Sequence, residues 1–259
     1  MTAGWYAHRR LDLPETPAAW PAALPQAVVV DLDGTLYPQA AYLRGAARAA
    51  ARAADSAGLS GRAVERALRR ELSTGSDRGG AVASALASCG VPAERAARLL
   101  PALAAAFVGH RPRRLPTYPG AVEALAALRL RFPVACLTDG TPAVQRAKLV
   151  ATGLRDAFDA VVISDELGGR AARKPHPAGL LAVAGLLGLP VAGLVLIGDR
   201  PSEDVALAAA LGAASIRVRT GAYAHAADSP AATVTVEDFA HAAALLLDHT
   251  GAHAQTRRG

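Results

Sequence analysis

Short apolar runs, each followed at once by polar residues, are the dominant pattern along this chain. The first run, Ala27–Val30, is rich in β-branched residues and leads directly into Asp31. Similar runs follow at Val134–Leu137, Ala160–Ile163, Gly193–Ile197 and Ala214–Val218. Runs of this length and composition are typical of strands that are buried on both faces of a sheet. We therefore predict five strands.

Helical patterns lie between these runs and are each closed by or near a glycine, at Ala121–Leu130, Pro142–Gly153, Ala178–Leu187 and Ser202–Leu211. Alternating strands and helices predict an α/β fold, a parallel sheet with helices on both faces. In such sheets ligands bind beyond the carboxyl ends of the strands. The polar residues of this chain gather at those predicted ends.

One long interval breaks the alternation. Residues 39–114 consist almost entirely of Ala, Arg and Leu at helical spacing, which predicts about four helices and no strand. We expect a helical lid inserted after the first strand, with hinges at Tyr37-Pro38 and at residues 111–116. The predicted division is an N-terminal extension, a catalytic core in two segments, a helical cap and a flexible C-terminal tail, at residues 1–26, 27–38 with 115–248, 39–114 and 249–259 respectively.

Composition adds limits on partners and location. The 259 residues carry a net charge of +6, but the Arg residues are scattered over predicted helices, without the dense basic run and aromatics of a nucleic-acid platform. We expect no nucleic-acid partner. Cys89 and Cys136 have no metal-ligand or CxxC companion, which favours buried thiols in a reducing compartment. With neither a secretion signal nor a membrane span expected, we predict a cytoplasmic protein.

The candidate chemistry begins at Asp31 and Asp33, directly after the first strand. Two carboxylates two residues apart can converge on one point, and a phosphate would be repelled there unless a divalent cation intervened. Hard oxygen ligands with open water positions suit Mg²⁺. Gly34 would let the backbone approach the phosphate, and Thr35 would anchor the turn. The alternative is that one Asp only caps the following helix.

Three further strand exits supply matching groups. Thr138 offers a hydroxyl to a phosphoryl oxygen, with the backbone N–H of Asp139 beside it, although such a turn is also ordinary loop chemistry. Lys174, stiffened by prolines, could offset negative charge, although alone it could be a surface residue. Asp199 is a candidate metal ligand, and Asp204 could orient Lys174 or a metal-bound water, unless both merely enrich a helix start in acids.

These residues carry a resemblance to the haloacid dehalogenase-like hydrolase superfamily. Its first motif, hhhDxDGT, is matched by Val28–Thr35, and its second by the strand that ends at Thr138. A lysine before proline matches at Lys174, and GDxxxxD matches from Gly198 to Asp204. The match spans about residues 27–218, and Gln145, Lys148, Gly153 and Leu154 resemble the helix that follows the second motif.

The resemblance implies a Rossmann-like three-layer α/β/α core with a helical cap, and a phosphatase-type member of the family. Asp31 would be the nucleophile and would also bind Mg²⁺. Asp33 would act as acid and then base, and its backbone carbonyl would ligate the metal. Thr138 and Lys174 would hold the phosphoryl group, and Asp199 would complete the metal site. Asp204 would support the metal site without binding the metal directly.

Subfamily and substrate rest on fewer residues. The acid at Asp33 argues against carbon–halogen or phosphonate cleavage, since the resemblance implies that such members lack it. We predict hydrolysis of a small phosphorylated metabolite, a sugar phosphate or nucleoside monophosphate, by a monomer or homodimer. A sugar phosphomutase and a catalytically idle binding module remain alternatives. Candidate substrate selectors near the hinges are Tyr37, Tyr42, Arg44, His110 and Arg111.

Overall fold

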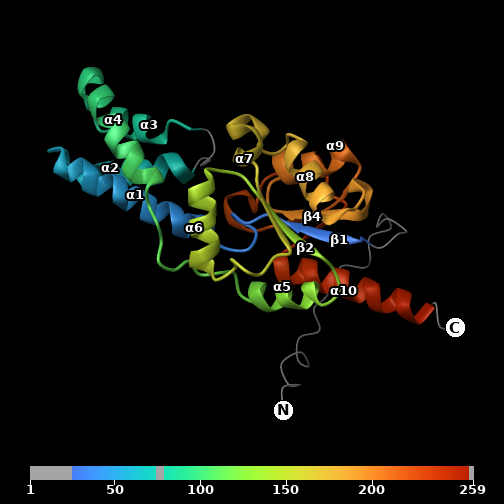
Figure 1. Ribbon diagram of the computed structural model, residues 1–259. Helices are drawn as coiled ribbons and strands as arrows, with labels where there is room; N and C mark the ends of the chain where they lie inside the picture. Colours follow the sequence, from blue (N-terminus) through green and yellow to red (C-terminus); the bar gives the residue numbers. More distant parts are fainter. Residues whose placement is uncertain (1–24, 74–78, 257–259) are drawn as a thin grey trace, which may run out of the picture.

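A six-stranded parallel sheet forms the centre of the protein (Figure 1). The computed structural model describes residues 25–73 and 79–256. The strands run in the order β3-β2-β1-β4-β5-β6, with bounds β1 Ala27–Val30, β2 Val134–Thr138, β3 Ala160–Ile163, β4 Leu194–Gly198, β5 Ala214–Val218 and β6 Val234–Val236. All five predicted strands are present. The edge strand β6 was not predicted, because three residues make too short a run to read from sequence.

Successive side chains of the central strand point to opposite faces of the sheet. Val28 and Val30 pack into the hydrophobic cluster that includes α5 (Ala121–Arg129) and α10 (Phe239–Thr256). Ala27 and Val29 pack into the cluster under α8 (Ala178–Leu187) and α9 (Ala206–Leu211). Figure 1 shows these helix pairs on opposite sides of the sheet. The predicted three-layer α/β/α class is therefore confirmed.

The strand register brings the polar exits to one edge. Val30 pairs with Cys136 of β2 on one side and with Ile197 of β4 on the other. The chain leaves β1 toward β2 and β3, then returns to β4 on the opposite side. The strand order thus reverses between β1 and β4, and such a reversal opens a crevice where α/β proteins bind ligands.

The connections within the core use ordinary helix signals. Helix α6 (Pro142–Thr152) has a proline in its first turn and ends at Gly153, whose φ is +75°. Where we predicted a helix from Ser202, the chain forms a π-helical turn, η3 (Pro201–Val205), before α9. The remaining short elements are α7 Asp165–Gly168, η1 Gly169–Ala172, η2 Val191–Gly193 and η4 Gly221–Tyr223.

Four helices and no strand occupy the described part of residues 39–114, which leaves out 74–78, as predicted. They are α1 Gln39–Ser56, α2 Gly61–Ser73, α3 Ala81–Ser88 and α4 Ala93–Val108. Their buried side chains form a hydrophobic cluster separate from the two that flank the sheet, with Leu68, Leu86 and Leu103 at its centre. We call these four helices the cap. Several of the buried side chains are alanines of α1, which lets the helices approach closely.

The predictions for the two ends of the chain have different outcomes. The expected N-terminal extension lies outside the described residues as far as residue 24. At the other end, α10 continues to Thr256, which corrects our expectation of a structureless tail from residue 249. Phe239, Ala242 and Leu246 anchor this helix in the core. Within the described ranges, no helix is long and apolar enough to cross a membrane.

We predict that Leu103→Ala destabilises the protein by about 2–5 kcal/mol, because this fully buried side chain would leave a cavity in the cap. Urea unfolding followed by circular dichroism measures the change. Leu130→Ala is the matched control: Leu130 is 84% exposed, so its truncation should alter stability by less than ~0.5 kcal/mol. Equal effects of the two substitutions would contradict the cap packing described here.

Candidate active site

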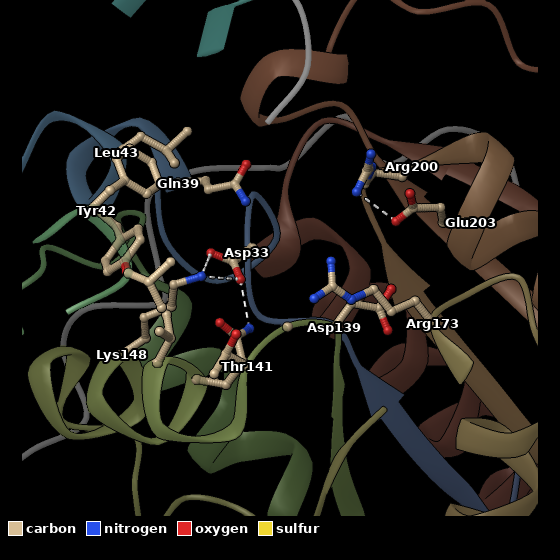
Figure 2. A pocket seen from close by; sticks show the side chains of 15 residues that line it. Asp33, Gln39, Tyr42, Leu43, Asp139, Thr141, Lys148, Arg173, Arg200 and Glu203 are labelled. Atoms are coloured by element: carbon tan, nitrogen blue, oxygen red, sulfur yellow. Dashed lines mark hydrogen bonds and ion pairs between the residues drawn. The ribbon is translucent and has the colours of Figure 1, made fainter. Parts of the chain in front are cut away.

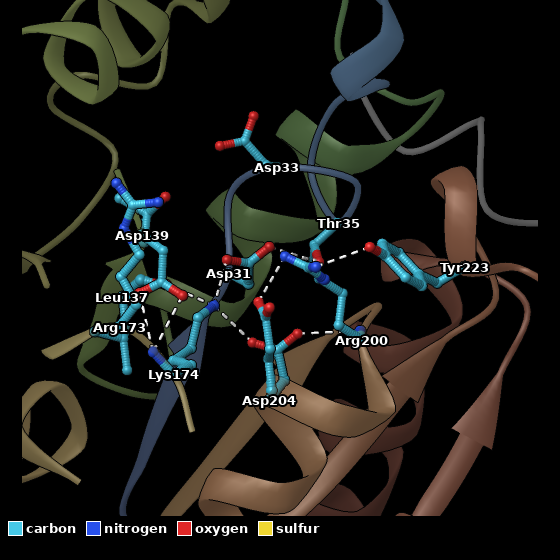
Figure 3. Close-up of polar contacts among 12 residues, drawn as sticks. Asp31, Asp33, Thr35, Leu137, Asp139, Arg173, Lys174, Arg200, Asp204 and Tyr223 are labelled. Carbon is cyan, nitrogen blue, oxygen red and sulfur yellow. Dashed lines mark hydrogen bonds and ion pairs between the residues drawn. The ribbon is translucent and has the colours of Figure 1, made fainter. Parts of the chain in front are cut away.

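Lys174 joins two carboxylates at the carboxyl edge of the sheet (Figure 3). Its Nζ lies 2.6 Å from Asp31 Oδ1 and 2.6 Å from Asp204 Oδ1. All three side chains are at most 5% exposed. Burial of a lone ammonium or carboxylate is costly, so each charge here depends on the others.

Asp199 completes a cluster of acids. Carboxylate oxygens of Asp31, Asp199 and Asp204 lie within 4.8 Å of one another, and all three residues are buried. Asp199 Oδ1 has no hydrogen-bond partner, although it is buried. Both oxygens of Asp204 are engaged, one by Lys174 and the other by the backbone N–H of Arg200 at 3.1 Å. An orphaned carboxylate oxygen beside a second carboxylate fits a divalent cation held mainly by Asp31 and Asp199.

The carboxylates of this cluster repel one another, which raises the pKa values of Asp31 and Asp199. Burial raises the pKa of Asp31 to about 7, and the neighbouring Asp204 adds to the rise while Lys174 opposes it. Burial also raises the pKa of Asp199 well above its usual value, with further increments from Asp31 and Asp204. The site therefore holds more carboxylate charge than its one lysine balances. A cation would relieve this excess.

Two glycines allow these groups to meet. Gly34 has φ +85°, and a Cβ there would lie 2.3 Å from Asp199 Oδ2. At Gly198, which ends β4, a Cβ would lie 2.2 Å from Asp204 Cγ. The Gly34 carbonyl accepts a hydrogen bond from Thr220 Oγ1 at 2.5 Å, which ties the first strand exit to the loop after β5. Both glycines are thus required by close approach.

The Asp33 carboxylate points away from Asp31 (Figure 3). Its two oxygens accept hydrogen bonds from Lys148 Nζ at 2.8 and 2.7 Å, and Gln145 Nε2 donates to it at 2.8 Å. The Tyr37 hydroxyl also donates to it. Burial alone would raise the pKa of Asp33, but Lys148 and these hydrogen bonds together lower it. Asp31 and Asp33 still line one small pocket together with Lys174. However, Asp204, not the Asp33 side chain, joins the cluster of acids. Whether the Asp33 carbonyl ligates a metal stays a prediction.

The other residues predicted at strand exits surround the same point. Thr138 is buried, and its hydroxyl accepts a hydrogen bond from Gln145 Nε2. The Asp139 carboxylate accepts the backbone N–H of Lys174 at 3.2 Å. Thr35 Oγ1 donates to Asp31 Oδ2 at 3.3 Å. The strand exits therefore assemble into one site.

Lys148 is a member of the site to which the sequence motifs gave no role. It lies on α6, is 4% exposed, and sits 4.6 Å from the centre of the Tyr42 ring on α1. One signal could have found it: Lys148 and Lys174 are the only two lysines of the chain, and every other member of the 28 Lys and Arg is Arg. Both of these compact ammonium groups meet buried carboxylates.

A cavity of about 240 Å³ opens above Asp33, between the cap and the core (Figure 2). Of the five proposed substrate selectors, Tyr42 lines it, and Tyr37 lies beneath it against Asp33. His110 packs on the Tyr42 ring with centroids 5.5 Å apart. Arg44 and Arg111 instead line two other surface pockets.

Comparison with known proteins places the chain in a family. The model of the haloacid dehalogenase-like hydrolases matches residues 25–212, so the chain belongs to that family of hydrolases. The match covers both the cap and most of the sheet. The resemblance stated from the motifs is therefore confirmed.

Individual relatives agree with this assignment. The chain is 38% identical to the phosphoserine phosphatase of Thermus thermophilus over 138 residues, 53% of this chain and 52% of the relative. It is 33% identical to the glyceraldehyde 3-phosphate phosphatase of Methanopyrus kandleri over 125 residues, 47% of this chain and 52% of that protein. The chain thus spans about half the length of these curated relatives. A crystal structure of a predicted phosphoglycolate phosphatase from Haemophilus somnus shares the fold, with a TM-score of 0.64 and 18% identity, covering 85% of this chain and 97% of that one.

We predict that Asp31→Asn stabilises the metal-free protein increasingly as pH rises from about 4 to about 7. Because the folded-state pKa of Asp31 is raised to about 7, ionisation of this carboxyl opposes folding over that interval, and Asn removes the effect. The gain relative to wild type should reach on the order of 4 kcal/mol near pH 8 in EDTA and vanish near pH 4.

Urea unfolding of both proteins across this pH range measures the difference. Asp156→Asn, at an exposed carboxylate, is the control and should change stability by less than ~0.5 kcal/mol. A difference between Asp31→Asn and wild type that does not vary with pH would contradict the prediction.

Proposed function

We propose that this protein is a Mg²⁺-dependent phosphatase that hydrolyses a small phosphorylated metabolite, a sugar phosphate or a nucleoside monophosphate, through an aspartyl-phosphate on Asp31. The observation that carries the proposal is the buried contact of Asp31 with Lys174 at 2.6 Å, beside the partnerless oxygen of Asp199. Membership of a hydrolase family and relatives named as phosphatases support it.

The metal would be held by the carboxylates of Asp31 and Asp199 and by the backbone carbonyl of Asp33. When bound, Mg²⁺ would neutralise the acids and draw the phosphate toward Asp31. Asp204 would act through Lys174 instead of as a ligand, since both of its oxygens already accept hydrogen bonds. This assignment retains the roles expected from the sequence.

The reaction would take two steps at phosphorus. Asp33 must first take up a proton from solvent, because Lys148 and the surrounding hydrogen bonds favour its ionised form. In the first step, an Asp31 carboxylate oxygen bonds to phosphorus while the bond to the leaving oxygen breaks, and the protonated Asp33 gives that oxygen its proton. In the second, Asp33 takes a proton from water, the water oxygen bonds to phosphorus, and the bond to Asp31 breaks, releasing inorganic phosphate. Thr138, the Asp139 N–H and Lys174 would hold the phosphoryl oxygens throughout.

We propose that Lys148 positions Asp33 for both proton transfers. Its ammonium contacts both carboxylate oxygens, and Gln145 and Tyr37 fix the remaining directions. Tyr42 covers Lys148 from the cap, so cap position and acid–base geometry are linked through one contact. Cap closure would also exclude water from the first step.

The location and assembly are proposals of the same kind. Cys136 is buried, but Cys89 is only partly buried, which corrects our expectation that both thiols are buried. We propose that the protein acts in the cytoplasm, where both cysteines would be free thiols. We propose a monomer or homodimer that engages only a small-molecule substrate.

We predict that Asp31→Asn lowers phosphate release from an aryl phosphate by roughly 1,000-fold or more, because the nucleophile is lost. EDTA should abolish wild-type release, and Mg²⁺ should restore it. Release of free phosphate is measured colorimetrically, with Asp156→Asn as a carboxylate-to-amide control at an exposed position. Wild-type turnover by Asp31→Asn would overturn the proposal.

We predict that Lys148→Met lowers kcat by roughly 100-fold with little change in KM, because Asp33 would lose the contact that orients it. Lys148→Arg should recover part of the loss, since a guanidinium can still pair with the carboxylate. Steady-state kinetics with the same aryl phosphate separates kcat from KM. A change confined to KM would assign Lys148 to substrate binding instead.

A further inference from the structure

The cavity above Asp33 has one apolar side. Leu43 on α1, Phe107 and Val108 on α4, and Val144 on α6 line it together with the ring of Tyr42. Phe107 and Leu43 are partly exposed, although both also pack against the hydrophobic clusters, and Val108 is 44% exposed. Because the cap contributes most of this wall, it faces the part of a substrate that lies beyond the phosphate.

The opposite side of the cavity is charged but balanced (Figure 2). Arg173 forms a bidentate ion pair with Asp165, at 2.6 and 2.7 Å. Arg200 pairs with Glu203 at 2.6 Å. These two arginines and Lys148 are the cavity's cationic side chains among the described residues, and Lys148 is held by Asp33.

This pairing of charges limits which leaving groups the cavity can bind. A substrate with a carboxylate on its leaving group, such as phosphoserine or phosphoglycolate, needs an unmatched cation to offset the cost of desolvating that charge. Lys148 and Arg173 each face an ionised carboxylate, and Arg200 does so once Glu203 is ionised, above the pKa of about 8 to which burial raises it. Binding a further anion would then mean breaking one of these ion pairs. An uncharged group has no such cost, and an apolar surface on it would cover the wall of Leu43 and Phe107.

We propose that the leaving group is uncharged and carries a flat apolar face, as the nucleoside of a nucleoside monophosphate does. The wall formed by Leu43, Phe107, Val108 and Val144 takes that face, and the hydroxyl of Thr141 at the cavity edge meets its polar rim. This inference rests on the proposed phosphatase activity and narrows its substrate. It separates this chain from relatives whose names specify carboxylated substrates.

The test is a comparison of kcat/KM on wild-type enzyme with Mg²⁺, using uridine 5′-monophosphate, an aryl phosphate, glucose 6-phosphate, phosphoglycolate and phosphoserine. The assay is run at about pH 9, because burial raises the pKa of Glu203 to about 8 and the ionised carboxylate is the form that matches Arg200. We expect the nucleotide and the aryl phosphate to exceed both carboxylated substrates by at least ~10-fold.

Two substitutions test which side of the cavity causes the substrate preference, one in the apolar wall and one on the charged side. Phe107→Ala should lower kcat/KM for the nucleotide and the aryl phosphate by roughly 10-fold and leave phosphoglycolate unchanged. Glu203→Gln should remove the negative charge that faces Arg200, which Tyr223 still holds in place, and raise kcat/KM for the carboxylated substrates several-fold. Leu130→Ala, at an exposed position on the core, is the control for expression and folding.

The outcomes separate the inference from the activity on which it rests. If no phosphomonoester yields phosphate with Mg²⁺, the proposed function fails. If phosphate is released but phosphoglycolate, phosphoserine or glucose 6-phosphate is preferred, the activity stands and the inference is overturned. Because this comparison uses wild-type enzyme, it decides the matter even if a variant does not fold.

Discussion

The ion pair between Lys174 and Asp31 is the contact on which the rest of the site depends. It joins a residue that follows β1 to one 143 positions later, and the same ammonium reaches Asp204. Without this ammonium, Asp31 and Asp204 could not both be buried as charged groups so close together. Even with Lys174 present, burial raises the pKa of Asp31 to about 7. The parallel register of β1 with β2 and β4 makes the contact possible, because it brings their exits to one edge.

Much of the fold could be predicted because buried parallel strands are continuous apolar runs. Val28–Val30 and Leu194–Ile197 are apolar on both faces, so their ends, and the polar residues beyond them, are visible in sequence. The same logic found the strand exits at Asp31, Thr138 and Asp199. It failed for β6, which is too short to form a run, and for the end of α10, where a mostly polar sequence that includes a glycine gave no helical signal.

The direction of the Asp33 side chain could not be predicted, because it depends on a partner from a distant helix. Spacing along a strand indicated convergence with Asp31, but Gln145 and Lys148 lie more than 100 residues away and draw the carboxylate toward α6. The local pattern of apolar and polar residues predicts where the backbone leaves a sheet. The orientation of a charged side chain there is set by tertiary contacts, as is the cavity that the cap and α6 form together.

The restriction of lysine to two buried positions also gives the protein a built-in spectroscopic label. Lysine labelled with ¹⁵N at Nζ and supplied during expression would mark only Lys148 and Lys174 among the side chains, since every other strongly basic side chain is Arg. Two Nζ resonances would then report separately on the carboxylate cluster and on the contact between α6 and the cap. No mutation would be needed to watch either place respond as a phosphate analogue is added.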